Sequence, residues 1–262
     1  MNAPASPLLQ PFPEYPDRVA AAFTTRGSFA GTSGPYATMN LGFRSGDDPG
    51  RVAANWRDAL AAAGLAGRPI AIPRMVHGDG CADLDALPDP GSFPAAGLPA
   101  WEPADADALR ATRPGRVLAV TMADCLTALV FDPSRGGIAA VHAGWRGTLA
   151  RILAKTLAAM AGSGRIDPAT TLVALGPCLR AQSLEVGPEV AERLDPRFVI
   201  RKEEKIYFDM PADNRAQALA SGILPAHIRD LGGDTLTEPE RFFSYRRDGA
   251  ASGRMAAFIS LR

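Results

Sequence analysis

Three side chains in this sequence have the types that bind a transition metal. His77 lies in the segment MVHGDG, Cys125 in MADCLT and His142 in AVHAGWRG. Two imidazoles and one thiolate make a metal site with one coordination position left for water or substrate. The three residues are separated by 48 and 17 positions, so only the folded chain could bring them together. The sequence therefore predicts a metal site assembled by tertiary structure.

Each of these residues also has an ordinary structural interpretation. A strand-end histidine can be satisfied by a carbonyl group, and a free cysteine is most often a small buried hydrophobe. The local context favours a functional role. Asp124 lies in an apolar stretch beside the cysteine, where an unpartnered carboxylate would be costly. Gly144 and Gly147 lie at the start of a predicted helix. Such glycines let the backbone approach a ligand closely, and the N-terminus of the helix favours an anion.

The remaining cysteines and the third histidine have no predicted role in this site. Cys81 follows a Gly-Asp-Gly turn, and Cys178 follows a strand in GPCL, so both are expected to be packing residues. His227 lies beside a proline and is expected to face solvent.

Composition and charge exclude several classes of protein. The chain has 262 residues, 47% of them hydrophobic, which is enough for one large domain or two closely packed halves. The 28 basic residues balance 28 acidic ones, so nothing favours nucleic acid or an anionic membrane. The N-terminus has no apolar region typical of a signal peptide, and Asp124 interrupts the best apolar run. Three scattered cysteines favour the reducing cytoplasm.

Strand and helix patterns mix along the chain without strict alternation, which favours mixed sheets over a doubly wound fold. Strands are expected over 19–25, 69–76, 117–121, 126–131, 138–141, 172–175, 206–209 and 255–261. Helices are expected over 48–63, from 147 or 148 to 160, briefly after 187, and over 211–220, with Asp48 as the cap of the first. Residues 86–104 are rich in Pro, Gly and Ala and predict a long surface loop.

Several arginines in glycine-bearing loops are candidates for binding an anion. Arg26, Arg44 and Arg146 lie in loops of this kind, which carry binding residues more often than core elements do. A forked guanidinium suits phosphate and carboxylate groups. We expect at least one of these arginines to point into the pocket of the metal ligands, and Asn40, in the NLGFR segment, to contact substrate.

The whole chain from residue 24 onward resembles the YfiH-like proteins. The matching segments are TTR (24–26), PYATMNLG (35–42), VHG (76–78), ADC (123–125), HAGWRGT (142–148), GPC (176–178), EVG (185–187), YFD (207–209) and FFSYRRDG (242–249). ADC and HAGWRGT are the most specific of these. The residue before VHG, usually glutamine in that family, is Met75 here.

The resemblance implies a fold, an activity and a metal. The fold would be α+β, a mixed α/β multilayer sandwich with mixed β-sheets flanked by helices, related to cysteine-hydrolase toxins. The chain would comprise an N-terminal extension over 1–18 and a single catalytic domain over 19–262. The family has been labelled a laccase-like polyphenol oxidase and a peptidoglycan editing factor, but phosphorolysis of purine nucleosides is better supported, with adenosine deamination in some members. Its zinc ligands match His77, Cys125 and His142.

The expected partners are a purine nucleoside and phosphate, without nucleic acid, membrane or an obligate protein partner. A metal with an open position could hold a phosphate oxygen, or activate water for deamination with Asp124 or Glu185 moving protons. Three alternatives stay open. Cys125 could be a nucleophile with His142 as its base, as in a hydrolase or deamidase. One copper ion would also suit a two-His, one-Cys site, although three histidines are too few for a multicopper oxidase. The protein could also be a catalytically idle binding or scaffold protein.

Overall fold

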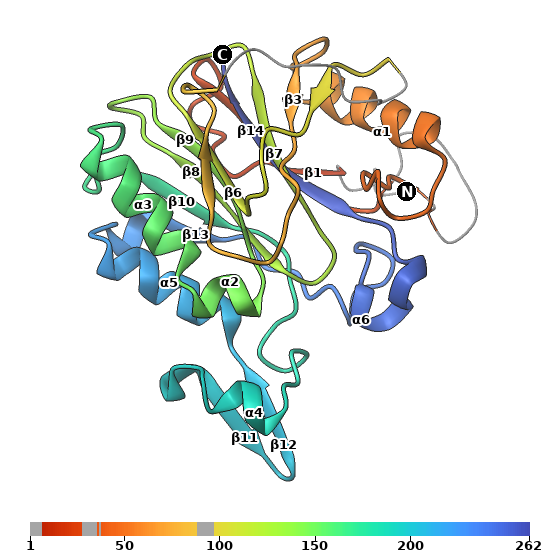
Figure 1. The fold of residues 1–262 in the computed structure, drawn as a ribbon, viewed down its shortest axis with the longest axis vertical. Coiled ribbons are helices and arrows are strands. Elements are labelled where there is room, and N and C mark those ends of the chain that lie inside the picture. Colours follow the sequence, from red (N-terminus) through yellow and green to blue (C-terminus); the bar gives the residue numbers. More distant parts are fainter. Residues whose placement is uncertain (1–6, 28–35, 37, 88–96) are drawn as a thin grey trace.

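Two six-stranded mixed sheets form the body of the protein, as seen in a computed structural model that describes residues 7–27, 36, 38–87 and 97–262 (Figure 1). The first sheet has the spatial order β1 (Leu8–Leu9), β2 (Val19–Thr24), β14 (Met255–Leu261), β7 (Val117–Met122), β3 (Ile70–Ala71), β5 (Ala100–Trp101). The second has the order β13 (Ile228–Asp230), β10 (Leu172–Leu175), β8 (Leu126–Phe131), β9 (Ile138–Ala143), β6 (Ala108–Ala111), β4 (Cys81–Asp83). Parallel and antiparallel pairs occur in both sheets, so the predicted mixed α+β sandwich is confirmed.

Alternating side chains on the strands build three apolar layers. On β8, Leu129 and Phe131 face the first sheet and belong to the core between the two sheets. Leu126, Ala128 and Val130 point the other way, into the core beneath the helices. Because such strands are buried on both faces, they appear in the sequence as continuous apolar runs.

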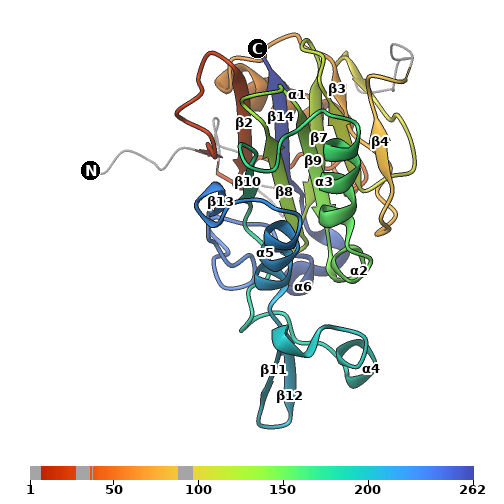
Figure 2. The same ribbon diagram turned by 90° about the vertical axis from the view of Figure 1, so that its left-hand side faces the viewer.

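Helices cover the outer face of each sheet (Figures 1 and 2). Helix α1 (Pro49–Ala62) packs on the first sheet, where the Trp56 and Phe258 rings lie 6.3 Å apart. Helices α3 (Ile152–Gly162) and α5 (Met210–Ala220) pack on the second sheet. Asp48 caps α1 by accepting from the N–H of Arg51, as predicted.

The single helix predicted up to residue 160 is wrong, because the chain forms two helices there. Helix α2 (Trp145–Leu149) ends before Arg151, which adopts a left-handed conformation with φ 62°. Side chains of α5 replace the lost helical contacts at this break. Gln217 donates to the carbonyl oxygen of Thr148, and Asn214 donates to the Thr148 hydroxyl. The break is therefore stabilised by a helix distant in sequence.

Short strands account for most other differences. The strand predicted over 69–76 covers only Ile70–Ala71, and Ala100–Trp101 within the predicted 86–104 loop form β5. The part of that loop at 88–96 lies outside the described residues. The sequence patterns missed β1, β4, β6, β11 (Val199–Lys202), β13 and helix α6 (Tyr245–Asp248), because elements of two to four residues carry no clear period.

Two further segments complete the fold. Within the predicted N-terminal extension, Leu8 pairs with Thr24 and Phe12 lies in the core between the sheets. Helix α4 (Pro188–Ala191) and the hairpin of β11 (Val199–Lys202) and β12 (Lys205–Phe208) project as an arm from the sandwich (Figure 2). Among the described residues, no helix has the length and apolar character needed to cross a membrane.

Candidate metal centre

The structure brings together the three residues that the sequence singled out. The ligand atoms of His77, Cys125 and His142 all lie within 4.8 Å of one another. The two imidazole rings meet edge to face, with centroids 5.1 Å apart and an interplanar angle of 82°. His142 is buried, Cys125 is half-buried and His77 is exposed. The cluster therefore has one open side.

The three residues meet at one edge of the two stacked sheets. Cys125 lies in the crossover that leaves β7 in the first sheet and enters β8 in the second. His142 lies on β9, the antiparallel neighbour of β8, where it pairs with Thr127. His77 lies in the loop that follows β3, and its backbone has a positive φ of 59°. The three residues are therefore brought together by neighbouring strand ends in the fold, and not by a short spacing in the sequence.

Asp107, which sequence analysis missed, holds two of these residues in place. Its fully buried carboxylate accepts hydrogen bonds from the backbone N–H groups of Val76 (3.1 Å), His77 (3.0 Å) and Gly78 (2.7 Å). It also lies 2.9 Å from Nδ1 of His142. An Nδ1–H donated to the carboxylate leaves Nε2 free for a metal. The available signal was a carboxylate directly before the short segment ALRA, in which three of four residues are apolar.

The same contacts shift the acid–base properties of the site. Burial opposes ionisation of the Cys125 thiol, but the charge of His142 and hydrogen bonds from His142 and His77 outweigh it and lower its pKa to about 6. Burial also opposes the charge on His142, but the Cys125 thiolate and the Asp107 carboxylate raise its pKa to about 9. The metal-free site therefore holds a thiolate–imidazolium pair at neutral pH.

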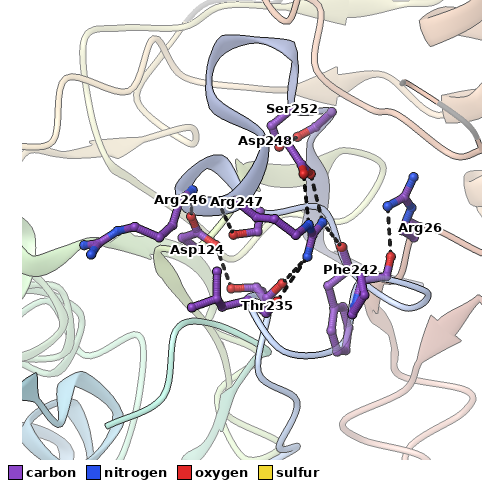
Figure 3. A network of polar contacts seen from close by, with 12 residues as sticks. Arg26, Asp124, Thr235, Phe242, Arg246, Arg247, Asp248 and Ser252 are labelled. Atoms are coloured by element: carbon purple, nitrogen blue, oxygen red, sulfur yellow. Dashed lines mark hydrogen bonds and ion pairs between the residues drawn. The ribbon is translucent and has the colours of Figure 1, made fainter. Parts of the chain in front are cut away.

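Asp124 fixes the loop that carries Cys125, and its predicted need for partners is confirmed. One carboxylate oxygen accepts from the hydroxyl of Thr235 at 2.7 Å, and the other from the N–H of Arg246 at 2.6 Å (Figure 3). Arg247, in the same network, donates to the carbonyl oxygens of Thr235 and Phe242. The crossover between the sheets is thereby tied to the C-terminal segment.

A glycine makes room for the sulfur. A Cβ atom at Gly144 would lie 2.8 Å from Sγ of Cys125 and 3.6 Å from the His77 ring. The close backbone approach expected at Gly144 is therefore observed, and it is directed at the candidate ligands themselves.

A cavity of about 550 Å³ opens on the three residues, within the range of small-molecule sites. Its lining is mainly apolar, with two arginines. The lining residues are Met75, His77, Thr121, Met122, Ala123, Asp124, Cys125, His142, Trp145, Leu179, Leu184, Met210, Tyr245, Arg246 and Arg254.

A second pocket of about 160 Å³ adjoins this cavity. The two share Met75, Thr121 and Arg254 in their walls. Among the other residues that line the second pocket are Phe43 and Trp101, which give it an aromatic side.

The predicted arginines do not line the cavity of the three candidate ligands. Arg44 lines the adjoining pocket and pairs with Glu102 at 2.6 Å. Arg26 donates to the carbonyl oxygen of Pro239 and lies over the ring of Phe243. Arg146 is exposed and lies over the ring of Trp145. The two cavity arginines instead come from the C-terminal segment.

Other candidates also take definite places. Asn40 is fully buried behind the cavity wall, where its side chain bonds to backbone and side-chain groups. Glu185 is exposed and pairs with Lys205 at 2.9 Å, outside the cavity lining. Cys178 is fully buried and Cys81 packs against the core, as predicted. His227, expected to face solvent, is only partly exposed, and its Nδ1 is buried.

The donor set suits a metal ion. A thiolate and two imidazole nitrogens are typical ligands of zinc and of copper. The Asp107–His142 contact is the arrangement that usually orients a metal-binding histidine. The three residues could therefore hold an ion at the wall of the cavity.

Comparison with known proteins agrees with this fold. The family described as "Multi-copper polyphenol oxidoreductase laccase" matches residues 20–262. "Purine nucleoside phosphorylase" of Deinococcus radiodurans is 37% identical, covering 100% of this chain and 95% of its own. "Purine nucleoside phosphorylase YfiH" of Escherichia coli K12 is 35% identical, covering 98% and 99%. The crystal structure of YlmD from Geobacillus stearothermophilus superposes with a TM-score of 0.84 at 27% identity, covering 100% and 98%.

The thiolate–imidazolium pair leads to a pH prediction for the metal-free protein. The rate of Cys125 alkylation by iodoacetamide should rise through a midpoint near pH 6, because only the thiolate reacts. In His142→Asn the midpoint should move up toward about 8.5, the ordinary value for cysteine. Cys125→Ser reports labelling at the other cysteines, whose pKa values burial raises. A midpoint unchanged in His142→Asn would contradict the pairing.

The role of Asp107 leads to a prediction about metal affinity. Asp107→Asn should weaken zinc binding about 10- to 100-fold, measured by competition with a chromophoric chelator, because the amide lacks the charge that orients His142. The matched control is Asp105→Asn, an exposed carboxylate two positions away that pairs with Arg74. Equal zinc affinity in the two variants would refute the role given to Asp107.

Proposed function

Because this chain belongs to the family described as multi-copper polyphenol oxidoreductase laccase, and its relatives are named purine nucleoside phosphorylases, we propose that it is a zinc-dependent purine nucleoside phosphorylase. It would convert an adenosine- or inosine-type nucleoside and phosphate into the free base and ribose 1-phosphate. The observation that carries the proposal is one cavity whose wall combines the His77, Cys125 and His142 cluster with arginine side chains.

The small number of histidine ligands argues against a multicopper oxidase. The whole sequence has three histidines, and only two of them lie in the cluster. His227 lies elsewhere, in a short 3₁₀ helix that precedes β13. A single two-His, one-Cys centre is what this chain can build, and a lone copper ion would be the alternative metal for it.

Phosphorolysis places three demands on the site. Phosphate must be held against C1′ of the ribose, the departing purine must be accommodated, and water must be kept out. A zinc ion, when bound, would supply Lewis acidity toward an oxygen atom in the cavity. Met75, Met122 and Leu179 give the cavity apolar walls suited to a purine ring. Asp107 keeps His142 oriented throughout, and cavity arginines match the charge of phosphate.

Adenosine deamination by the same site would draw on Asp124. Of the two carboxylates that sequence analysis left open, only Asp124 lines the cavity, whereas Glu185 pairs with Lys205 on the surface. Zinc deaminases use an acidic residue that is not a metal ligand to move protons. Asp124 therefore has the position for this part, adjacent to Cys125.

One observation supports a second candidate function. Cys125, His142 and Asp107 form a thiolate, imidazole and carboxylate relay like that of a cysteine hydrolase or deamidase. His77 has no role in that mechanism, although it contributes to the cluster. Metal ligation and nucleophilic attack draw on the charge of the same sulfur atom, so the two functions compete at one site.

The proposed substrates are small molecules, and we place the reaction in the cytoplasm. The three cysteines are free, which suits a reducing compartment.

The proposal predicts release of purine that depends on both phosphate and metal. The protein should release hypoxanthine from inosine and form ribose 1-phosphate, measured by liquid chromatography across a range of phosphate concentrations. Removing zinc with a chelator should abolish release, and added zinc should restore it. Cys125→Ser should lose bound metal and activity together, since thiolate is a ligand. The control Cys81→Ser, at a packing residue, should keep both.

Two results would count against this function. Release of free ribose without phosphate would indicate a hydrolase acting on nucleosides. Activity that survives the chelator, together with a covalent thioester on Cys125 seen by mass spectrometry after an ester substrate, would favour the nucleophilic mechanism.

A further inference from the structure

Arg254 lies where the two pockets meet. It lines the cavity of the metal cluster, which consists of His77, Cys125 and His142. It also lines the adjoining pocket that has an aromatic side. Its side chain is half-buried, and burial lowers the pKa of its guanidinium. The charges of Asp124 and Cys125 act on it across the cavity. This arginine therefore lines the cavity of the three candidate ligands, although it lies outside the glycine-bearing loops that the sequence favoured.

The guanidinium of Arg254 has N–H donors that could bind a ligand. Its Nη1 donates to the carbonyl oxygens of Ser252 (2.6 Å) and Gly253 (3.0 Å), which fixes the plane of the group. Across the described parts of the chain, Nε and Nη2 have no hydrogen-bond partner and no carboxylate forms an ion pair with Arg254. A half-buried arginine in this state offers a fork suited to two oxygens of one anion.

The segment Asn40-Leu41-Gly42 holds Arg254 in place. Oδ1 of Asn40 accepts from the N–H of Arg254 at 2.8 Å and from the N–H of Gly42 at 3.0 Å. The N–H of Leu41 donates to the carbonyl oxygen of Arg254 at 2.8 Å. Asn40 is in turn held by Ser45 and Asp47, which accept from its Nδ2. The backbone of Arg254 is thus bonded on both sides of its Cα.

Gly42 leaves room for the side chain of Arg254. A Cβ atom at position 42 would lie 2.6 Å from Cγ and 2.9 Å from Cβ of Arg254. The arginine therefore lies across the glycine on its way to the cavity. This contact, together with the backbone bonds, gives the buried, polar Asn40 and Gly42 a role in holding the arginine at the wall of the two pockets.

The other arginine of the cavity is less suited to this role. Arg246 is exposed, and its Nη2 donates to the carbonyl oxygen of Glu185 at 3.2 Å. Its backbone N–H, which bonds to Asp124, serves the loop of Cys125. Solvent screens an exposed charge more than a half-buried one, so Arg254 offers the stronger field.

We propose that Arg254 binds the phosphate co-substrate beside the metal cluster, and that Asn40, Leu41 and Gly42 are its positioning residues. This inference rests on the proposed phosphorolysis for the identity of the anion. Phosphate would lie between the guanidinium and the cluster, so the ribose C1′ would face it near Met75 and Thr121, the other residues shared by the two pockets. The adjoining pocket would then be open to the part of the nucleoside that points away from the cluster.

The test compares Arg254→Gln, Arg254→Lys and the exposed control Arg193→Gln in zinc-loaded protein. Arg254→Gln should raise the KM for phosphate about 10- to 100-fold, because a charge-assisted hydrogen-bond pair is lost. Arg254→Lys keeps the charge without the forked guanidinium, so its KM for phosphate should lie between those of the wild type and Arg254→Gln. Arg193→Gln should match the wild type, and zinc content should be unchanged in all three. An unchanged phosphate KM in Arg254→Gln overturns the proposal.

A second variant tests positioning separately from charge. Gly42→Ala keeps Arg254 but displaces the Cβ and Cγ atoms of its side chain, so the phosphate KM should rise while zinc affinity stays near wild type. The unfolding temperature should also fall, because these atoms lie next to the backbone and cannot move freely. A purely structural role for the segment would lower the unfolding temperature and leave the phosphate KM unchanged, which would refute positioning.

Binding measurements keep this inference distinct from the proposed function. If the wild type shows no phosphorolysis, the proposed function fails, and titration calorimetry with inorganic phosphate decides the role of Arg254. Phosphate that binds wild type and Arg193→Gln but not Arg254→Gln supports an anion site at Arg254. Equal binding to all three, or binding to none, overturns it.

Discussion

The buried carboxylate of Asp107 is the interaction on which the site depends. It joins the loop of His77 to the strand of His142 through three backbone N–H groups and one imidazole nitrogen. Burying an isolated carboxylate would cost several kcal/mol. Burial does oppose the charge of Asp107, but the hydrogen bond of His142 and those of the backbone hold its pKa below the usual range. The charge therefore persists, and with it the orientation of both histidines.

The sequence predicts the long buried strands and helix α1 because each has a local cause, whereas the three clustered side chains are singled out by residue type and by resemblance to a known family. Runs such as LTALVF follow from burial on both faces, and Asp48 with Pro49 starts a helix by its own chemistry. Asp107 and Arg254 escape such reasoning. Each directly precedes a strand, Asp107 before β6 and Arg254 before β14. The role of each depends on hydrogen bonds with residues distant in sequence. Glycine-bearing loops, the feature that favoured Arg26, Arg44 and Arg146, indicate freedom of the backbone rather than direction of a side chain.

The same atoms could serve metal ligation or nucleophilic attack by Cys125. The two differ in whether the proton on His142 stays or leaves. In the metal-free site Cys125 is already a thiolate, while His142 carries a proton that its raised pKa holds. A metal needs the thiolate as it stands and the free Nε2 of His142, so binding displaces one proton near neutral pH. Once ligated, the sulfur shares its charge with the metal and is a weaker nucleophile. His77 therefore marks the choice, because metal ligation uses it and a cysteine hydrolase does not.

Backbone strain gathers where the three candidate ligands meet. Of the four described non-glycine residues with positive φ, His77 is one of the candidate ligands and Asp124 precedes another. Such conformations cost about 1–2 kcal/mol each, so the surrounding contacts must hold them. Asp107 accepts from the N–H of His77, and Leu179 donates to the carbonyl oxygen of Asp124. The continuous cores on both faces of the second sheet provide the stability for this strain. A short crossover between two well-packed sheets is thus a place where a cysteine can be held out of regular structure and turned toward two histidines.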